Sequence, residues 1–306
     1  MPPRAAVVLV TNPRAGSGRG REAGQRAARW LEAHGAAVRL VESERPGHAT
    51  ALARAAADEG PDLVAAVGGD GTLHEVAAGL HARPVPRPLL GVVPVGTGND
   101  FARTLGLHGA TPERAAAALL HGVPRPLDLG RLEGVDAGGP TAWFVNNVGV
   151  GYLAAATIER ERLRRALPGE LGYLVGGFVA LAKHRAPLWT VDVDGVALTG
   201  RFVLLHVANG PWCGAGIRLT PDARTDDGLL DVAVVAERSR LRCLLDWPRL
   251  REGTQREDVA LLRGRRVRIH GPRGFWLHAD GELARVPLGV LEVSLVPRAL
   301  EVLAPA

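Results

Sequence analysis

Lysine is almost absent from this sequence: among 37 Lys and Arg residues, only Lys183 is a lysine. Cysteine is also scarce, and Cys213 with Cys243 makes neither a zinc-binding spacing nor a disulfide framework. Tyr and Phe number 2 and 5, which leaves few rings for stacking bases and argues against a nucleic-acid-binding protein. The wealth of Arg, Ala, Gly and Pro is typical of biased coding, so the arginine excess alone indicates little about function.

Long hydrophobic runs are missing as well. The longest, Leu171 to Ala182, is shorter than the ~20 residues that a membrane-spanning helix needs. Met1 to Arg4 leads directly into a strand-like segment, without the apolar region and cleavage site of a signal peptide. We therefore expect a soluble, cytoplasmic protein with reduced thiols. A net charge of +5 still indicates an anionic partner: nucleic acid, a membrane surface or a phosphorylated small molecule.

Short apolar strands alternate with Ala-rich helical segments in the first half of the chain. The predicted strands are Ala6–Thr11, Val38–Val41, Leu63–Val67 and Leu89–Val93. This alternation predicts βαβ units and a Rossmann-like parallel sheet. Thr111 followed by Pro112 predicts the start of a further helix.

The pattern changes after about Pro126, where the strands are expected to be mainly antiparallel. Asp194-Gly195 between two strand-like segments predicts a two-residue hairpin. Helices are expected at Leu153–Leu167 and Leu171–His184, and the last expected strands are Leu288–Val296 and, after Pro297, Ala299–Leu303. The predicted fold class is α/β, with a parallel-sheet nucleotide domain and a mainly antiparallel β-sandwich domain.

Three glycine-rich loops follow predicted strands of the first half. They are Asn12–Gly18, Gly68–Thr72 and Pro94–Asp100. Ligands of open α/β sheets bind beyond the carboxyl ends of the strands, and backbone N–H groups of such loops bind phosphate. A carboxylate beside phosphate is repulsive, so Asp70 is expected to hold Mg²⁺. Plain βα turns rich in glycine remain the alternative, and neither the Walker nor the dinucleotide-binding pattern is present.

These motifs resemble those of the diacylglycerol kinase catalytic domain, and the whole chain resembles the bacterial lipid kinases related to diacylglycerol and sphingosine kinases. NAD kinases share the Gly68–Thr72 motif, whereas the third motif, extended through Phe101 and Ala102, favours the lipid-kinase branch. The resemblance implies an ATP site made by Asn12, Pro13, Arg14, Ala15, Gly16, Ser43, Gly69, Asp70, Gly71, Thr72, Leu73, His74, Glu75 and Thr97.

Acidic residues cluster at two places in the second half. Asp226, Asp227 and Gly228 suit a solvated turn before a strand, which is the plainer interpretation, although oxygen ligands packed this densely could also hold a hard cation. The resemblance favours Mg²⁺, bound by the Asp227 carboxylate with the backbone oxygens of Arg224 and Leu229, in a role that supports the fold.

The second cluster is Asp280-Gly281-Glu282, either a plain hairpin turn or a catalytic site. Kinase chemistry needs a carboxylate that accepts the proton of the attacking hydroxyl. The resemblance assigns that role to Glu282, with Asp280 as a rival or as a member of the metal network of Asp70. His48, His74 and His278 are interpreted as structural residues, and Trp212 as a possible substrate contact.

The resemblance further implies a nucleotide domain of residues 1–128 and 297–306, a lipid-substrate domain of residues 129–296, and an active site in the cleft between them. The expected reaction is Mg²⁺-assisted transfer from ATP to a lipid hydroxyl, which would make phosphatidic acid from diacylglycerol. An NAD kinase-like phosphotransferase and a non-catalytic nucleotide- or lipid-binding protein are the alternatives.

The lipid substrate would be reached during transient visits to the inner face of the membrane. Basic clusters there would face anionic lipid, although solvated surface is the plainer interpretation. A homodimer is a further possibility. The clusters are Arg160, Arg162, Arg164 and Arg165; Arg238, Arg240 and Arg242; and Arg263, Arg265, Arg266 and Arg268.

Overall fold

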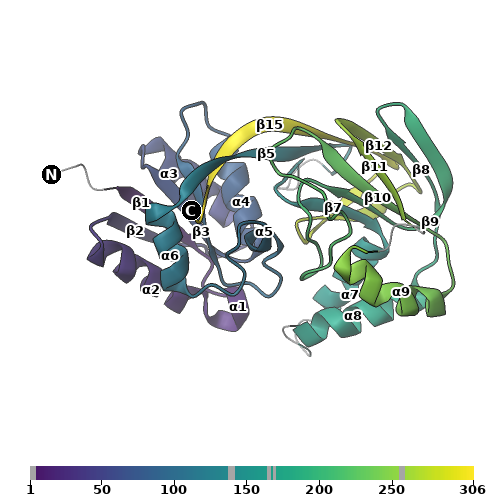
Figure 1. Cartoon of the computed structure of the whole chain (residues 1–306), viewed down its shortest axis with the longest axis horizontal. Coiled ribbons are helices and arrows are strands. Elements are labelled where there is room, and N and C mark those ends of the chain that lie inside the picture. Colours follow the sequence, from purple (N-terminus) through teal and green to yellow (C-terminus); the bar gives the residue numbers. More distant parts are fainter. Residues whose placement is uncertain (1–4, 137–141, 164–166, 168–169, 255–258) are drawn as a thin grey trace. The chain divides into compact units, whose positions relative to one another are not determined.

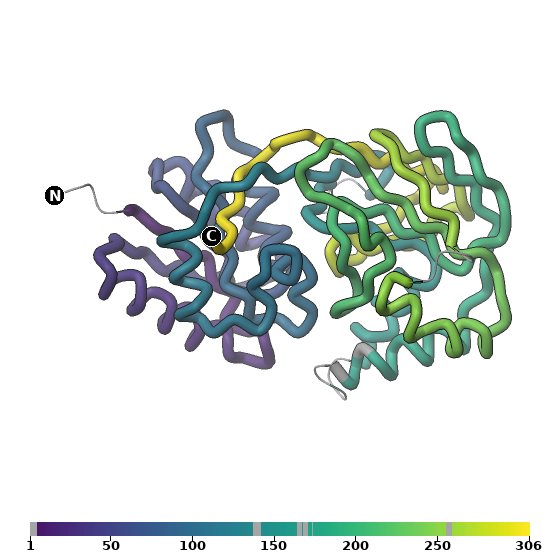
Figure 2. The backbone as a smooth tube through the Cα atoms, viewed as in Figure 1, coloured from purple at the N-terminus to yellow at the C-terminus, as the bar shows by residue number. Residues whose placement is uncertain are grey.

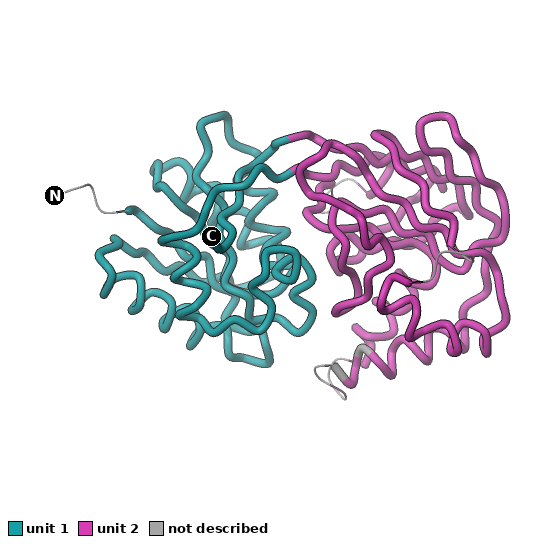
Figure 3. The backbone as a smooth tube through the Cα atoms, in the orientation of Figure 1, with its two compact units in different colours: residues 1–127, 298–306 teal, residues 128–297 magenta. Residues whose placement is uncertain are grey.

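A computed structural model describes residues 5–136, 142–163, 167, 170–254 and 259–306 of the chain. The backbone forms two compact units, shown in teal and magenta in Figure 3. Unit 1 comprises residues 1–127 and 298–306, and unit 2 comprises residues 128–297. The chain leaves unit 1 along β5 (Val123–Glu133) and returns to it along β15 (Val290–Ala304). The end of the chain, yellow in Figure 2, is therefore part of unit 1.

Unit 1 is built on a parallel sheet in the order β15-β4-β3-β1-β2. The strands are β1 (Ala6–Thr11), β2 (Ala37–Glu42), β3 (Leu63–Gly68) and β4 (Leu89–Pro94), and the end of β15 joins them where Val302 pairs with Leu90. All of β3 is buried, as expected for a central strand covered on both faces. The parallel order places the loops after β1, β3 and β4 at one edge of the sheet.

Helices cover both faces of this sheet (Figure 1). Helix α2 packs with α6 on one face, over a core that includes Leu9, Leu31 and Leu119, and α3 packs with α4. Thr111 Oγ1 accepts a hydrogen bond of 3.2 Å from Arg114 N, which caps α6 as the sequence predicts. The helices of unit 1 are α1 (Ala15–Gly18), α2 (Gly20–Ala33), α3 (His48–Asp58), α4 (Asp70–His81), α5 (Asp100–Thr104) and α6 (Pro112–His121).

Unit 2 is an antiparallel β-sandwich. The long strand β9 (Val196–Ala208) pairs with β8 through its first half and with β7 and β10 through its second half, so it contributes to both sheets. Asp194 and Gly195 make the predicted hairpin turn with φ of 48° and 92°. The other strands are β6 (Trp143–Phe144), β7 (Asn147–Gly151), β8 (Leu188–Val193), β10 (Leu230–Ala236), β11 (Val259–Gly264), β12 (Arg266–His270), β13 (Phe275–Ala279) and β14 (Glu282–Val286).

The core between the two sheets of unit 2 contains buried Phe144, Trp189, Leu205, Ile269 and Leu277. A second, smaller apolar cluster lies on the other face of β9 and β10 and includes Leu204, Cys213 and Ile217. Cys213 is buried, as expected for a packed thiol. Three helices belong to the described part of this unit: α7 (Tyr152–Leu163), α8 (Glu170–Lys183) and α9 (Arg240–Glu252).

The predicted fold class, a parallel-sheet α/β domain followed by an antiparallel β-sandwich, is confirmed. One prediction differs from the structure, and one helix was not predicted. The sequence predicts separate strands on the two sides of Pro297, but β15 is one strand. Pro297 lies between the part of β15 that pairs with β12 and the residue that pairs with β4, so these pairings do not need its missing N–H. Helix α9 was not predicted at all.

Candidate active site

The second and third glycine loops touch through their backbones. A Cβ atom placed on Gly96 would lie 2.4 Å from the Cα of Gly69, so only glycine fits there without displacing the loops. Val95 N also donates a hydrogen bond of 2.8 Å to Gly68 O. The loop after β3 and the loop after β4 therefore form one continuous backbone surface.

The first loop joins the same assembly. Asn12 N donates to Val67 O at 3.0 Å, and Asn12 Nδ2 lies 3.4 Å from Thr72 Oγ1 in the first turn of α4. A Cβ on Gly16 would lie 2.1 Å from Val95 O, so this loop also contacts the third loop. The prediction that the three loops gather at one edge of the sheet agrees with these contacts.

Asp70 is the first residue of α4, and its Oδ1 accepts a hydrogen bond of 3.2 Å from Phe101 N at the start of α5. This bond connects the second loop to the third. A small cavity beside it is lined by Gly69, Asp70, Leu73 and Asn99. Asn99 adopts a left-handed conformation, with φ 52°, and its Nδ2 donates to Gly96 O at 2.6 Å. The carboxylate thus lies at the junction of the two loops.

The remaining predicted nucleotide-site residues fall into two groups. Pro13 and Arg14 lie in the first loop, Ala15 begins α1 and Gly71 is the second residue of α4. These four residues, like Ser43 and Thr97, are at least partly exposed. Leu73 and His74 are buried in α4. Glu75 has a clear structural task, since its carboxylate accepts hydrogen bonds from Gly47 N at 2.8 Å and Ala49 N at 2.9 Å and so caps α3.

The loop assembly suits a phosphate-bearing ligand. Gly69 precedes α4 without a side-chain cap, so the N–H groups of the first turn are not satisfied by a capping side chain. Helix starts of this kind bind phosphate oxygens. The side chain of Asp70 supplies the hard oxygen that Mg²⁺ prefers. Residues of unit 1 therefore fit a nucleotide with its metal ion.

In unit 2, Asp280 is buried in the turn between β13 and β14 with φ 50°. Its Oδ2 accepts a hydrogen bond from Val145 N at 2.7 Å, and its Oδ1 accepts from Asn146 N at 2.9 Å and Asn147 N at 3.0 Å. Three amide donors on one carboxylate fix it in place. This arrangement gives Asp280 the features of a positioning residue.

Glu282 begins β14 and is exposed, whereas Asp280 is buried. The turn that Asp280 fixes therefore presents Glu282 from a rigid support.

Gly149 on β7 pairs with both His206 and His278 on the neighbouring strands, which puts the two rings on one face of the sheet. Burial lowers the pKa of His206 to about 3 and that of His278 to about 4, so both are neutral at pH 7.

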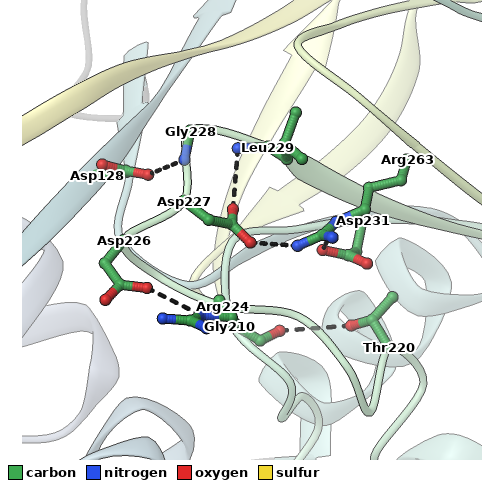
Figure 4. A network of polar contacts seen from close by, with 10 residues as sticks. All are labelled: Asp128, Gly210, Thr220, Arg224, Asp226, Asp227, Gly228, Leu229, Asp231 and Arg263. Atoms are coloured by element: carbon green, nitrogen blue, oxygen red, sulfur yellow. Dashed lines mark hydrogen bonds and ion pairs between the residues drawn. The ribbon is translucent and has the colours of Figure 1, made fainter.

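Figure 4 shows the second acidic cluster. Asp128, which is fully buried, accepts a hydrogen bond of 2.7 Å at Oδ2 from Gly228 N and thereby holds the turn. Asp227 Oδ1 accepts from Leu229 N at 3.0 Å, and Asp227 Oδ2 is bonded to Arg263 on β11. Arg224 Nε donates to Asp226 Oδ1 at 3.2 Å. The turn is thus closed by hydrogen bonds from both sides.

This turn fits the predicted Mg²⁺ poorly in the arrangement seen. Both oxygens of Asp227 have partners, and one of them is the guanidinium of Arg263, which also lies 3.5 Å from Asp231 Oδ2. Burial raises the pKa of Asp231 to about 6, while the charge of Arg263 opposes that rise. A metal ion on Asp227 would have to compete with Arg263.

At least five of the nine described arginines of the predicted basic clusters form ion pairs. Arg162 contacts Glu159, and Arg268 contacts Glu292. Arg238 and Arg242 share one oxygen of Asp246, at 3.0 and 2.9 Å. Arg164 and Arg165 lie outside the described residues. Among the helices described, none combines the length and the hydropathy needed to cross a bilayer.

Several residues were not predicted to take part in these networks. They are Val145, Asn146 and Asn147, whose amides hold Asp280, with Asp128 and Arg263 around Asp227. All of them contact partners far away in the sequence, so no local motif marks them. The neighbouring Asn209 binds Asp128 O and Val145 O through its Nδ2, at 2.8 and 2.7 Å, and so links the two acidic sites.

Fold and loops together define a nucleotide-using enzyme of two units. Residues 6–132 match the model of the diacylglycerol kinase catalytic domain, and residues 146–304 match that of the YegS C-terminal NAD kinase beta sandwich-like domain. The chain therefore belongs to the diacylglycerol kinase family of lipid kinases, and membership of a kinase family implies use of a nucleotide.

Relatives and solved structures agree with this assignment. The chain is 31% identical over 302 residues to a diacylglycerol kinase of Mycobacterium tuberculosis, a match covering 98% of this chain and 95% of the relative. It is 32% identical over 238 residues to a diacylglycerol kinase of Bacillus subtilis, covering 77% and 76%. A crystal structure of a diacylglycerol kinase from Bacillus anthracis superposes with a TM-score of 0.72 at 22% identity, covering 98% and 97%, which supports the fold.

Proposed function

We propose that this protein transfers the γ-phosphate of ATP to the hydroxyl of a lipid, with diacylglycerol as the substrate and phosphatidic acid as the product. The observation that carries the proposal is the joined surface of three glycine loops in unit 1, in a chain whose relatives are named diacylglycerol kinases. The exposed Glu282 on its fixed turn supplies the acid-base group that such a transfer needs.

In the proposed reaction the lipid hydroxyl oxygen attacks the γ-phosphorus of ATP. The bond from that phosphorus to the bridging oxygen of ADP breaks, and the hydroxyl proton passes to the carboxylate of Glu282. Backbone N–H groups at the start of α4 and the loop residues Asn12 and Thr97 bind and orient the phosphates. The proposal requires that the loop residues of unit 1 and Glu282 of unit 2 act on the same phosphoryl group.

Asp70 would hold Mg²⁺, whose charge neutralises the phosphate oxygens during transfer. The bond from Phe101 N keeps the Asp70 carboxylate oriented while it does so. The near absence of lysine fits this division of tasks, because no loop of the assembly contains one. The negative charge of the phosphates would then be bound by backbone amides and arginine and neutralised by the metal ion.

The test is a γ-phosphate transfer assay with Mg-ATP and a panel of diacylglycerol, sphingosine, other lipid alcohols and NAD. Labelled phosphatidic acid is the expected product. Glu282→Gln should lower kcat at least 100-fold, since general acid–base catalysis typically contributes about 10²–10⁴-fold. Asp70→Asn should also lower kcat strongly, because the Mg²⁺ would lose the carboxylate proposed to hold it. Both variants should melt within about 2 °C of the wild type.

The matched control is Glu237→Gln, which changes an exposed glutamate of unit 2 in the same way and should keep full turnover. Transfer to NAD but to no lipid would make the protein an NAD kinase-like enzyme. Near-normal turnover of Glu282→Gln would remove that residue from the role of proton acceptor.

A further inference from the structure

Helix α9 exposes apolar side chains to solvent and buries one of its two acids, Asp246, whereas the other, Glu252, is exposed. Leu241 is 66% exposed and Leu245 67% exposed, while Asp246 is only 3% exposed. Helices on the surface of a globular protein normally have the opposite arrangement. Leu244 and Trp247 are also exposed, at 42% and 37%. We call these four residues, Leu241, Leu244, Leu245 and Trp247, the α9 apolar face.

The inner side of α9 explains why this orientation is stable. Asp246 accepts bonds from Arg238 and Arg242, which neutralises it where it is buried. Cys243 is half-buried, and Leu250 packs against the apolar cluster outside the sandwich. Ser239 Oγ caps the start of the helix by accepting from Arg242 N at 3.2 Å. The helix lies along the outside of unit 2 (Figure 1). Its inner contacts therefore fix it in an orientation that leaves Leu241 and Leu245 exposed.

Arginines border the leucines of the α9 apolar face on both sides, and Arg240 and Arg251 separate these leucines from Trp247. At about 100° per residue, Arg240 and Arg251 fall on one side of the leucines, and Arg242 and Arg249 on the other. Long arginine side chains beside an apolar stripe can place their charge among lipid phosphates while the stripe enters the acyl region. Tryptophan is enriched at that boundary. Exposed leucines beside arginines are thus compatible with contact between this helix and a membrane interface.

We propose that α9 docks this protein on an anionic bilayer, with the α9 apolar face in the lipid and its arginines on the phosphates. The choice of a lipid surface rests on the lipid-kinase function proposed above, because the substrate lies in a bilayer. A second copy of the chain fits less well, because in a two-fold interface the exposed arginines Arg240, Arg249 and Arg251 would outnumber Glu252, the exposed acid of the helix, on each side.

The test is sedimentation of the full chain with phosphatidylcholine vesicles that contain 30% or no phosphatidylglycerol. We expect binding to the anionic vesicles and at least tenfold weaker binding to the neutral ones. The double variant L241S/L245S should bind anionic vesicles at least tenfold more weakly. Arg240→Gln with Arg251→Gln should weaken binding by about fivefold for each charge lost, as expected for arginines at an anionic surface.

The matched control is L188S/L288S, which changes two leucines that are 63% and 77% exposed away from α9 and should bind like the wild type. Wild-type binding by L241S/L245S would overturn the proposal. So would a wild-type dimer that becomes monomeric in L241S/L245S, because a second copy would then cover the face.

A second assay separates docking from catalysis. With a short-chain diacylglycerol in detergent micelles, L241S/L245S should keep wild-type transfer, whereas with vesicles its rate should fall at least tenfold. Loss of transfer in both assays would contradict a docking role. If the wild type phosphorylates no lipid and still needs α9 to bind vesicles, the proposed function fails while the docking surface stands.

Discussion

Gly96 approaches Gly69 so closely that a Cβ on Gly96 would lie 2.4 Å from the Cα of Gly69 and 2.8 Å from Asn99 Oδ1. Two loops that follow different strands are thus joined at a point where neither has a side chain. The phosphate-binding surface proposed for unit 1 depends on this contact, because the same loops carry Asp70 and Thr97.

Gly96→Ala should therefore separate the loops. We expect a loss of about 1–3 kcal/mol in the free energy of unfolding, as for other overpacked sites, and at least tenfold weaker ATP binding by calorimetry. The control is Gly109→Ala, whose Cβ would meet nothing within 4 Å although its φ is 68°. It should cost about 1 kcal/mol and leave ATP binding unchanged. Equal ATP affinity in Gly96→Ala would show that the contact is dispensable.

Asp280→Asn should lower stability more than Glu282→Gln. An amide NH₂ in place of one carboxylate oxygen would face a backbone N–H, either that of Val145 or those of Asn146 and Asn147. Leaving a buried donor of this kind unsatisfied costs about 1–3 kcal/mol in the free energy of unfolding. Urea unfolding of both variants measures the difference. If Asp280→Asn unfolds like the wild type yet has no turnover, Asp280 is the better candidate for the proton acceptor.

Because Arg263 already pairs with Asp227, the stability of the Asp227 turn should not depend on a metal ion. The wild type should melt within about 1 °C in EDTA and in millimolar Mg²⁺, because the guanidinium already neutralises Asp227. Arg263→Gln should lose about 1 kcal/mol, as for a partly exposed pair, and recover it with Mg²⁺. Arg268→Gln, whose pair with Glu292 is similarly exposed, should not respond to Mg²⁺. A wild type that EDTA destabilises would instead support the predicted metal site.

Local sequence patterns predicted the parts of the molecule that local physics determines. The hairpin at Asp194-Gly195 and the cap at Thr111 each need only adjacent residues, and both are present. The glycine loops follow from strand ends in an alternating βα chain. Their gathering at one edge is a property of parallel sheets rather than of these residues alone.

Features that depend on distant partners could not be read from the sequence. Asp280 is fixed by amides that lie more than 130 positions earlier in the chain. The role of Arg263 depends on the pairing of β10 with β11. Helix α9 was missed because Pro248 lies inside it and because its polar and apolar sides are reversed, so the usual pattern of a buried apolar stripe is absent.

Acid should destabilise the protein through His206. Both nitrogens of its ring are buried without a hydrogen-bond partner among the described residues, and burial lowers its pKa to about 3, with the charge of His278 adding to this. Burial also lowers the pKa of His278 to about 4; Asp280 opposes that shift and Arg160 adds to it.

The direction of the pH effect follows from where protons bind. Below about pH 6.5 the unfolded chain takes up a proton on His206, while the folded protein does so only near pH 3. Stability is therefore complete above pH 6.5 and falls as the pH drops from 6.5 toward 3, by about 1.4 kcal/mol per unit for this histidine. His206→Leu and His206→Gln both lack the titrating ring and should each reduce the slope of the unfolding free energy between pH 6 and 4.5 by that amount. Glutamine keeps a polar group at this position and leucine does not. Equal reduced slopes in the two variants would therefore assign the pH dependence to protonation of His206 rather than to lost polarity. A wild-type slope in both variants would exclude His206 as the source of the pH dependence.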